Sequence, residues 1–297
     1  MSSRVLITGL SSFTGPYLSE ALLEDGYELF GLSQSGDSPV EGVVSLHGNL
    51  LDSASLLAAV RECKPDYVIH LGAITFVPYG DASEIYQTNV VGSRNLLQAL
   101  VEAGCAPERV ILASSANVYG NSVEGQLDED TPFAPANDYA VSKVAMEYMA
   151  RIWSDRLPVS YVRPFNYTGR GQSEKFLIPK IVSHFQQGER VIELGNTDVI
   201  RDFSDVRYVA RAYAGLVKAA APGEAYNICS GEGYSLKSII DTMNRLAGYD
   251  IEVRVNPDFV RANEIRRLVG DNTRLRSVCP QLTPIPMDET LSWMYPR

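Results

Sequence analysis

Short runs of apolar residues alternate along the first half of the chain with longer segments whose apolar residues recur every three or four positions. The short runs are typical of buried strands, and the longer segments are typical of amphipathic helices. The predicted strands are 4–8, 27–33, 43–46, 66–72, 109–115 and 159–165, and the helices between them include 53–63, 82–103 and 138–154. Six strands separated by helices predict an α/β fold with a doubly wound parallel sheet.

The first strand ends in a glycine loop, Gly9-Leu-Ser-Ser-Phe-Thr-Gly15, and a helical segment with Pro16 in its first turn follows. Such a loop lets backbone N–H groups and a helix N-terminus approach a pyrophosphate, as in Rossmann-type sheets. Ser12 stands where a middle glycine is usual, and a strand-to-helix turn also takes glycine for steric reasons alone. The loop therefore indicates dinucleotide binding only together with other signals.

The end of the second predicted strand bears on which dinucleotide is bound. An Asp or Glu there usually binds the adenosine ribose of NAD, whereas this chain has Ser33-Gln34-Ser35. An uncharged end tolerates a 2′-phosphate better than a carboxylate does, so NADP is mildly favoured over NAD. No arginine accompanies these residues, so NAD stays open.

The helix predicted over 138–154, with Asp138 as its N-cap, carries Tyr139 and Lys143 one turn apart. We expect the ammonium to lie beside the phenol and to lower its pKa from about 10, which makes a proton donor or acceptor near neutral pH. Sixteen tyrosines make this spacing common by chance. A catalytic pair is favoured because Tyr139 and Lys143 follow the predicted strand 109–115 in a chain that begins with a glycine loop typical of nucleotide binding.

Beyond residue 165 the alternation becomes less regular. We expect a loop at 166–173, helices at 175–188, 206–220 and 235–247, strands at 199–203, 225–229 and 251–255, and a C-terminal helix after Pro286. The chain is thus divided into a nucleotide-binding domain, 1–165, and a smaller α/β substrate domain, 166–297. The helix 206–220 is expected to pack back on the first domain.

Composition excludes several classes of protein. A net charge of −10 argues against a nucleic-acid or anionic-membrane partner, and no apolar run approaches the length of a membrane span, so a cytoplasmic protein is expected. The four cysteines and three histidines show no metal-ligand spacing, so we expect no metal. Residues 161–297 hold eighteen Lys and Arg against sixteen Asp and Glu, and the first 160 hold eight against twenty. The second half therefore has the arginines available to an anionic ligand.

Six motifs in the first half together resemble the extended short-chain dehydrogenase/reductase family, or NAD-dependent epimerase/dehydratase family, which modifies nucleotide sugars. They are Thr8 to Gly15, His70 to Ala73, Thr88 to Gly92, Ser114 to Gly120, Tyr139 to Lys143, and Arg163 to Asn166. The resemblance implies that Ser115 hydrogen-bonds the reacting sugar oxygen, Tyr139 is the acid/base and Lys143 holds the nicotinamide ribose. It implies these cofactor-binding residues: Gly9, Ser12, Phe13, Gly15, Ser33, Gln34, Asn49, Leu50, Leu71, Gly72, Ala73, Asn89, Tyr139 and Lys143.

Motifs in the second half resemble the branch of GDP-mannose 4,6-dehydratases and GDP-4-keto-6-deoxymannose reductases. They are Phe165 to Gly169, Gln172 to Phe176, Arg201 to Val206, Tyr226 to Gly231, Arg261 to Glu264, and Gly270-Asp271. By this resemblance a GDP-sugar is the substrate, and arginines suit its diphosphate. The implied substrate-binding residues are Thr75, Ser115, Asn117, Asn166, Leu177, Lys180, Arg201, Arg261 and Glu264.

The reaction depends on the residue two positions after Ser115. The dehydratases of this branch carry there a glutamate that removes the C5 proton, whereas this chain has Asn117. A neutral amide is no general base, which favours NAD(P)H-dependent reduction of the C4 ketone of a GDP-4-keto-6-deoxyhexose. A 4-epimerase and a dehydratase with a substitute base stay open, and a non-catalytic dinucleotide sensor is disfavoured. The resemblance also implies a homodimer through the helices 82–103 and 138–154.

Overall fold

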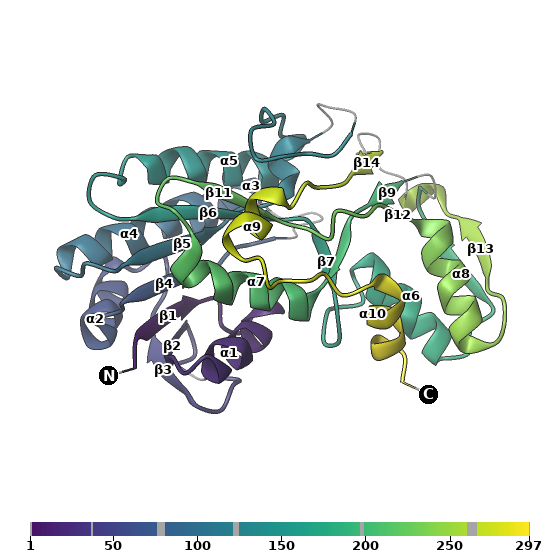
Figure 1. Cartoon of the computed structure of the whole chain (residues 1–297), viewed down its shortest axis with the longest axis horizontal. Coiled ribbons are helices and arrows are strands. Elements are labelled where there is room, and N and C mark those ends of the chain that lie inside the picture. Colours follow the sequence, from purple (N-terminus) through teal and green to yellow (C-terminus); the bar gives the residue numbers. More distant parts are fainter. Residues whose placement is uncertain are drawn as a thin grey trace.

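A computed structural model of the chain describes residues 2–36, 38–75, 81–120, 125–196, 199–259 and 266–296. Its large sheet consists of β1 (Arg4–Thr8), β2 (Glu28–Ser33), β3 (Val43–His47), β4 (Tyr67–His70), β5 (Arg109–Ala113), β6 (Val159–Pro164) and β11 (Ala225–Ile228). Within the described ranges, these seven strands are all parallel and lie in the order β11-β6-β5-β4-β1-β2-β3 (Figure 1). The predicted doubly wound parallel sheet is confirmed.

Helices cover both faces of this sheet. The helices α1 (Thr14–Glu24) and α7 (Val206–Ala219) lie on one face, and α2 (Ser53–Cys63), α4 (Ser93–Glu102) and α5 (Asp138–Arg151) lie on the other (Figure 1). In β1 the side chains of Val5 and Ile7 join the core beneath α1 and α7, while Leu6 joins the opposite core. A strand buried on both faces needs apolar residues at every position, which explains the short continuous runs in the sequence.

The sheet has one strand more than the six predicted. β11 was expected in the substrate domain, but it pairs with β6, with Tyr226 opposite Val162. The crossover helix α7 leads into it and packs against α1. The apolar side of α7 is buried against the large sheet, and the free edge of β6 in the same sheet pairs with β11.

Two helices of the first half differ from their predicted form. The helix expected over 82–103 is divided into α3 (Ala82–Tyr86), a π-helical turn η1 (Gln87–Gly92) and α4. At Gly92 a Cβ would lie 2.9 Å from Leu50 Cβ, so the chain passes close to its neighbour there. The N-cap of α5 is Asn137, whose Oδ1 accepts from the Ala140 N–H at 2.9 Å, and not Asp138. The backbone of Asn137 is extended, as a cap requires, and Asp138 is already helical and accepts from the Tyr86 hydroxyl.

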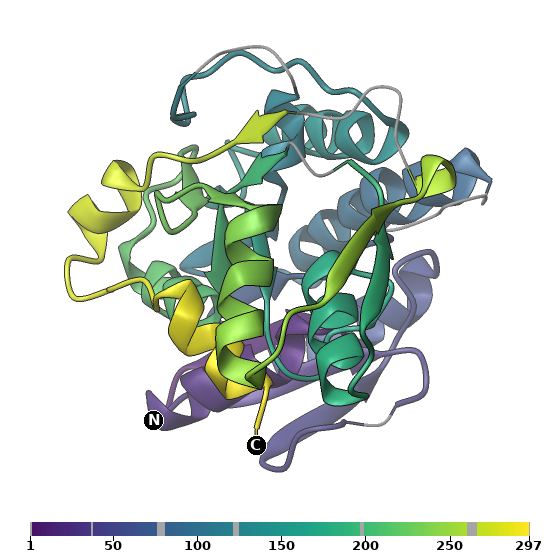
Figure 2. The ribbon, with the colours of Figure 1, turned by 90° about the vertical axis from the view of Figure 1, so that its right-hand side faces the viewer.

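The smaller part of the molecule has its own core, and Figure 2 turns it toward the viewer. The helices α6 (Leu177–Gln186), α8 (Leu236–Ala247) and α10 (Met287–Met294) enclose this core with the parallel pair β8 (Val191–Leu194) and β13 (Glu252–Val255). Shorter elements join the two parts: β7 (Asn166–Thr168), β9 (Ile200–Arg201), β10 (Phe203–Asp205), β12 (Tyr234–Ser235), β14 (Arg267–Leu268), η2 (Ala116–Tyr119), η3 (Pro257–Phe259) and α9 (Thr273–Val278). β7 lies in the expected loop 166–173, and the expected strand 199–203 is split into β9 and β10.

Two kinds of feature are absent from the described ranges. No helix there has the length and apolar character needed to cross a bilayer. No group of three or more His, Cys, Asp or Glu side chains in those ranges has the arrangement of a metal site.

Candidate active site

The predicted cofactor loop lies at the carboxyl ends of β1 and β4, where the order of the strands reverses. From β1 the chain builds β2 and β3 on one side, and it then returns to build β4 and the later strands on the other. Such a reversal is the usual place for a dinucleotide in an open parallel sheet. Gly9 has a φ of +72°, and a Cβ there would lie 2.7 Å from Gly72 N. The positive φ and the close approach of Gly72 both require glycine at this position.

The start of α1 fits an anionic group. Phe13, which precedes the helix, offers no side-chain cap to its first turn. A Cβ at Gly15 would lie 2.0 Å from Leu10 O, so the turn leaves no room for a side chain. An uncapped helix N-terminus next to a glycine loop suits a pyrophosphate.

A residue of the second half holds this loop. The Phe13 ring stacks on the Tyr167 ring with centroids 5.9 Å apart, and Thr14 Oγ1 lies 2.8 Å from the Tyr167 hydroxyl oxygen. Sequence reasoning missed Tyr167, although it belongs to the motif Phe165 to Gly169. The contact joins β7 to the cofactor loop.

The other predicted cofactor residues border the same edge of the sheet. Ser33 ends β2, and Gln34 follows it. After β3, the Asn49 side chain accepts from the Leu51 N–H at 2.9 Å, and Leu50 lies against Gly72, where a Cβ would be 3.0 Å from its Cδ1. Leu71, Gly72 and Ala73 follow β4 directly. The structure therefore brings together the residues that the motifs predicted separately.

Ser115, Tyr139 and Lys143 meet at the end of β5. Ser115 caps η2, with its Oγ accepting from the Asn117 N–H at 3.2 Å, and it is hydrogen-bonded to the Tyr139 phenol. Lys143 Nζ donates to Ala113 O at 2.7 Å and lies 5.9 Å from the centroid of the Tyr139 ring. A hydroxyl, a phenol and an ammonium in this arrangement can orient a carbonyl oxygen and exchange a proton with it.

The predicted lowering of the phenol pKa is wrong. Burial raises the pKa of Tyr139 to about 12, and the hydrogen bond from Ser115 offsets only part of that effect. Burial also lowers the pKa of Lys143 to about 8, against the opposing charge of Glu147. The ammonium is directed at a backbone carbonyl, and desolvation outweighs its proximity to the ring.

Asn89 lies in η1 and is fully buried. Its Oδ1 accepts from the Ile74 N–H at 2.8 Å, and its Nδ2 donates to Ile74 O at 3.1 Å and to Ser142 Oγ at 3.0 Å. It thus ties the segment that follows β4 to α5.

Three buried polar atoms near the ends of β5 and β6 have no hydrogen-bond partner among the described residues. They are Ser114 Oγ, Asn166 Nδ2 and Ser204 Oγ. Buried polar groups in native proteins are nearly always bonded, so these atoms fit a site that a polar ligand completes. Asn166 was predicted. Ser114 lies in a motif that was singled out, whereas no sequence signal points to Ser204.

The remaining predicted substrate residues are spread along the smaller part. Leu177 begins α6, and Lys180 donates to Glu193 O at 2.8 Å with its Nζ 4.6 Å from the centroid of the Phe259 ring. Arg201 Nη1 donates to Ile200 O at 3.0 Å and to Arg266 O at 3.3 Å. Thr75 is exposed beyond β4, Asn117 is half-buried beside Ser115, and Arg261 and Glu264 lie outside the described residues.

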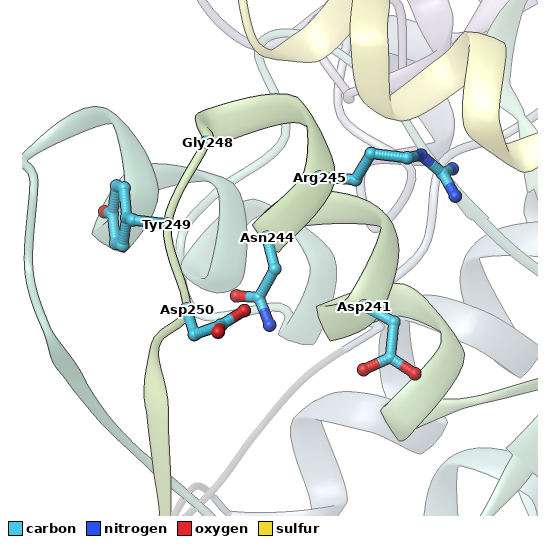
Figure 3. A pocket seen from close by; sticks show the side chains of 6 residues that line it. All are labelled: Asp241, Asn244, Arg245, Gly248, Tyr249 and Asp250. Atoms are coloured by element: carbon cyan, nitrogen blue, oxygen red, sulfur yellow. The ribbon is translucent and has the colours of Figure 1, made fainter.

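A surface hollow of about 360 Å³ lies elsewhere, at the C-terminal end of α8. Its lining consists of Asp241, Asn244, Arg245, Gly248, Tyr249 and Asp250 (Figure 3). Asn244 Oδ1 accepts from the Ile251 N–H at 3.0 Å, and Arg245 pairs with Asp288. These side chains stabilise the end of the helix, and none of the predicted site residues lines the hollow.

Comparison with known sequences decides the family. The sequence model of the GDP-mannose 4,6 dehydratase family matches residues 6–279, which include the glycine loop and the Ser115–Tyr139–Lys143 cluster. The chain belongs to this family. It is therefore an NAD(P)-dependent short-chain dehydrogenase/reductase and a nucleotide-sugar oxidoreductase.

Individual family relatives cover nearly the whole chain. The GDP-6-deoxy-D-talose 4-dehydrogenase of Aggregatibacter actinomycetemcomitans is 34% identical over 93% of this chain and 90% of its own length. The GDP-6-deoxy-D-mannose reductase of Pseudomonas aeruginosa is 34% identical over 95% and 94%.

Two solved structures show the same fold. A Burkholderia cenocepacia J2315 protein, provisionally called an epimerase, is 47% identical, with a TM-score of 0.93 over 99% of this chain and 97% of that one. RMD from Pseudomonas aeruginosa, solved with NADPH, is 31% identical, with a TM-score of 0.85 over 99% and 98%.

Proposed function

We propose that the protein uses NAD(P)H to reduce the C4 ketone of a GDP-4-keto-6-deoxyhexose. The observation that carries this proposal is the amide of Asn117 beside the Ser115–Tyr139–Lys143 cluster. Asn117 is the second residue of η2, two positions after the Ser115 cap, and the other residues of this turn, Ala116, Val118 and Tyr119, carry no carboxylate either. The names of the two relatives at 34% identity support a 4-keto or 4-hydroxy GDP-6-deoxy sugar.

The residues of the cluster have distinct roles in this reaction. When bound, the cofactor supplies a hydride to C4. The Ser115 hydroxyl, which is hydrogen-bonded to Tyr139, would orient the ketone oxygen, and the Tyr139 phenol would donate its proton to that oxygen. Lys143, whose Nζ donates to Ala113 O, would hold the nicotinamide ribose. A phenol with a pKa of about 12 is protonated at neutral pH, so the proton is in place before the reaction.

NADP is favoured over NAD as the cofactor. β2 ends in Ser33 without a carboxylate, and the Pseudomonas RMD structure contains NADPH. A carboxylate at this position would repel the 2′-phosphate.

The nucleotide part of the substrate is assigned to the smaller part of the molecule. Asn166 supplies an unbonded Nδ2, and Leu177 and Lys180 lie in the first turn of α6. Arg201, Arg261 and Glu264 complete the set by resemblance. In this proposal residues 1–165 bind the cofactor and residues 166–297 bind the substrate. The elements α7 and β11 belong to the second range in sequence but pack with the large sheet of the first.

Product analysis distinguishes the proposed reduction from its alternatives. With a GDP-4-keto-6-deoxyhexose and NADPH we expect one coenzyme oxidised per sugar, and a deuterium label on the coenzyme is expected at C4 of the product. With GDP-mannose alone we expect no reaction. Loss of water from GDP-mannose without added reductant would establish a dehydratase, and inversion at C4 without net coenzyme oxidation would establish an epimerase.

We also propose a homodimer that uses α5 and the neighbouring η1. Val141, Tyr148 and Ile152 form an exposed apolar stripe along α5, and Ile152 is 77% exposed, while Val91 is exposed on η1. Such a stripe is costly to leave in water and fits a second copy of the same helices. Light scattering is expected to give twice the chain mass, and Ile152→Lys is expected to shift the measured mass toward that of the single chain.

A cytoplasmic location is proposed as well, and cell fractionation tests it.

A further inference from the structure

An unbroken series of hydrogen bonds joins the cofactor loop to the backbone of Tyr139. Thr8, the residue before Gly9, lies with its Oγ1 2.6 Å from His70 Nδ1, and His70 Nε2 lies 2.9 Å from Ser93 Oγ. Ser93 Oγ donates to Asn89 O at 2.7 Å. The Asn89 amide continues the series to Ser142 Oγ, which donates to Tyr139 O at 2.7 Å.

The direction of every bond in the series can be assigned. Ser93 and Ser142 each give their only hydroxyl hydrogen to a backbone carbonyl, which cannot donate, so both must accept from the preceding member. Ser93 therefore accepts from His70 Nε2–H, which leaves His70 Nδ1 as the acceptor for the Thr8 hydroxyl. Thr8 Oγ1 in turn accepts from the Gly72 N–H at 3.3 Å. The imidazole is thus neutral, with its hydrogen on Nε2.

The series is sealed from water. Thr8, His70, Asn89, Ser93 and Ser142 are each no more than 2% exposed. Burial and the charge of Lys143 both lower the pKa of His70, to about 3, which agrees with the neutral tautomer. A protonated ring would leave the Thr8 hydroxyl hydrogen without an acceptor, so the network has one self-consistent state.

We propose that His70 is a positioning residue which, through Thr8 on one side and Ser93 on the other, sets the place of the Tyr139 helix relative to the cofactor loop. The proposal rests on the proposed function in taking Tyr139 as the proton donor. His70 itself touches no reacting atom. Its ring spans the gap between the end of β1 and the π-helical turn that carries Asn89, and a phenylalanine of similar size would fill this space without making either bond. Hydride and proton transfer require donor and acceptor within a few tenths of an ångström of their reacting positions.

The decisive experiment uses variants that keep the volume of the core and each remove the side-chain hydrogen bonds of one member of the series. These are Thr8→Val and Ser93→Ala, with His70→Phe as a third variant. Thr242→Val is the matched control, because Thr242 is also a buried threonine with a side-chain bond, to Asp288, but lies in α8 of the smaller part. Amide hydrogen exchange over residues 140–144 in the cofactor-free protein is the first readout.

We expect Thr8→Val and Ser93→Ala to accelerate exchange at 140–144 by about fivefold to tenfold, the size of a net hydrogen-bond contribution to stability, and Thr242→Val to leave it unchanged. The second readout is steady-state turnover, in which kcat is expected to fall about tenfold or more while KM for NADPH changes less than about threefold. Unchanged exchange in folded Thr8→Val, or an equal change in the control, would overturn the proposal. If His70→Phe does not fold, the results for Thr8→Val and Ser93→Ala decide whether the proposal holds.

The two readouts separate this inference from the proposed function. If wild-type protein fails to reduce the keto sugar, the proposed function is wrong, and the exchange data still decide whether the series positions α5. If exchange responds but kcat does not, the series is structural and His70 does not position the reaction.

Discussion

Glu147 and Arg163 form a buried ion pair that holds the catalytic helix against the sheet. Arg163 Nη2 lies 2.7 Å from Glu147 Oε2 and its Nε donates to Oε1 at 3.0 Å, with the two side chains 4% and 0% exposed. Arg163 Nη1 also donates to the Tyr119 hydroxyl at 3.0 Å and to Glu129 O at 2.9 Å. The pair thus joins α5, one turn beyond Lys143, to β6.

Glu147→Gln removes the negative charge and keeps the shape of the side chain. Arg163 then stays buried and charged with neutral partners only, and breaking a buried pair in this way costs about 3–5 kcal/mol. Because the amide of the glutamine keeps one oxygen as an acceptor, we expect a loss of about 3 kcal/mol, at the lower end of that range. The quantity measured is the free energy of unfolding from urea denaturation, with the slope unchanged.

Asp241→Asn is the control for this prediction. Asp241 pairs with Lys237 at 2.6 Å, but the two side chains are 55% and 80% exposed, so we expect a loss below about 0.5 kcal/mol. A loss below about 1 kcal/mol in Glu147→Gln, or equal losses in the two variants, would show that the buried pair does not hold α5 as described.

Three further outcomes are expected. Tyr139→Phe keeps the ring and removes the hydroxyl, so turnover should fall at least about a hundredfold with folding intact, and activity within a fewfold of wild type would remove Tyr139 as the acid. Lys143 has a pKa of about 8 when folded and about 10.4 when unfolded, so the unfolded chain binds the extra proton between these values. The stability of cofactor-free wild type should therefore rise relative to Lys143→Met as pH rises through this window, by at most about 1.4 kcal/mol per pH unit, and a falling difference would contradict the assignment. Calorimetry should show GDP binding more tightly than UDP or dTDP, with Arg201→Ala costing roughly tenfold to a hundredfold in GDP affinity; tighter UDP or dTDP binding would contradict the GDP assignment.

The sequence predicted those features that depend on local pattern. Six strands, the loop from Gly9 to Gly15 and the Tyr139–Lys143 spacing follow from apolar periodicity and from residue types at fixed separations. The family resemblance then added Ser115 and Asn89 to the candidate site residues. Short-range rules suffice because parallel strands present their carboxyl ends together.

Other features depend on contacts that no local pattern encodes. The apolar run 225–229 predicts a strand but does not indicate to which sheet the strand belongs. The packing of α7 on the large sheet brings β11 beside β6. The pKa of Tyr139 rises because other elements bury the phenol, and the Lys143 ammonium one turn away donates to Ala113 O. Asn137 and Asp138 are equally good caps by type, and their backbone angles decide between them. Ser204 is recognisable only from its unbonded oxygen.

The place of β11 at the edge of the large sheet determines how the chain can fold during synthesis. Residues 225–228 pair with β6. The ribosome has therefore made most of the 297-residue chain before the large sheet can gain its edge strand β11. Until then β6 is an unpaired edge, and the core beneath α1 lacks the side chains of α7. A nascent or truncated chain that ends near residue 165 therefore exposes a strand edge and an apolar face together, the condition under which chains associate wrongly and chaperones bind.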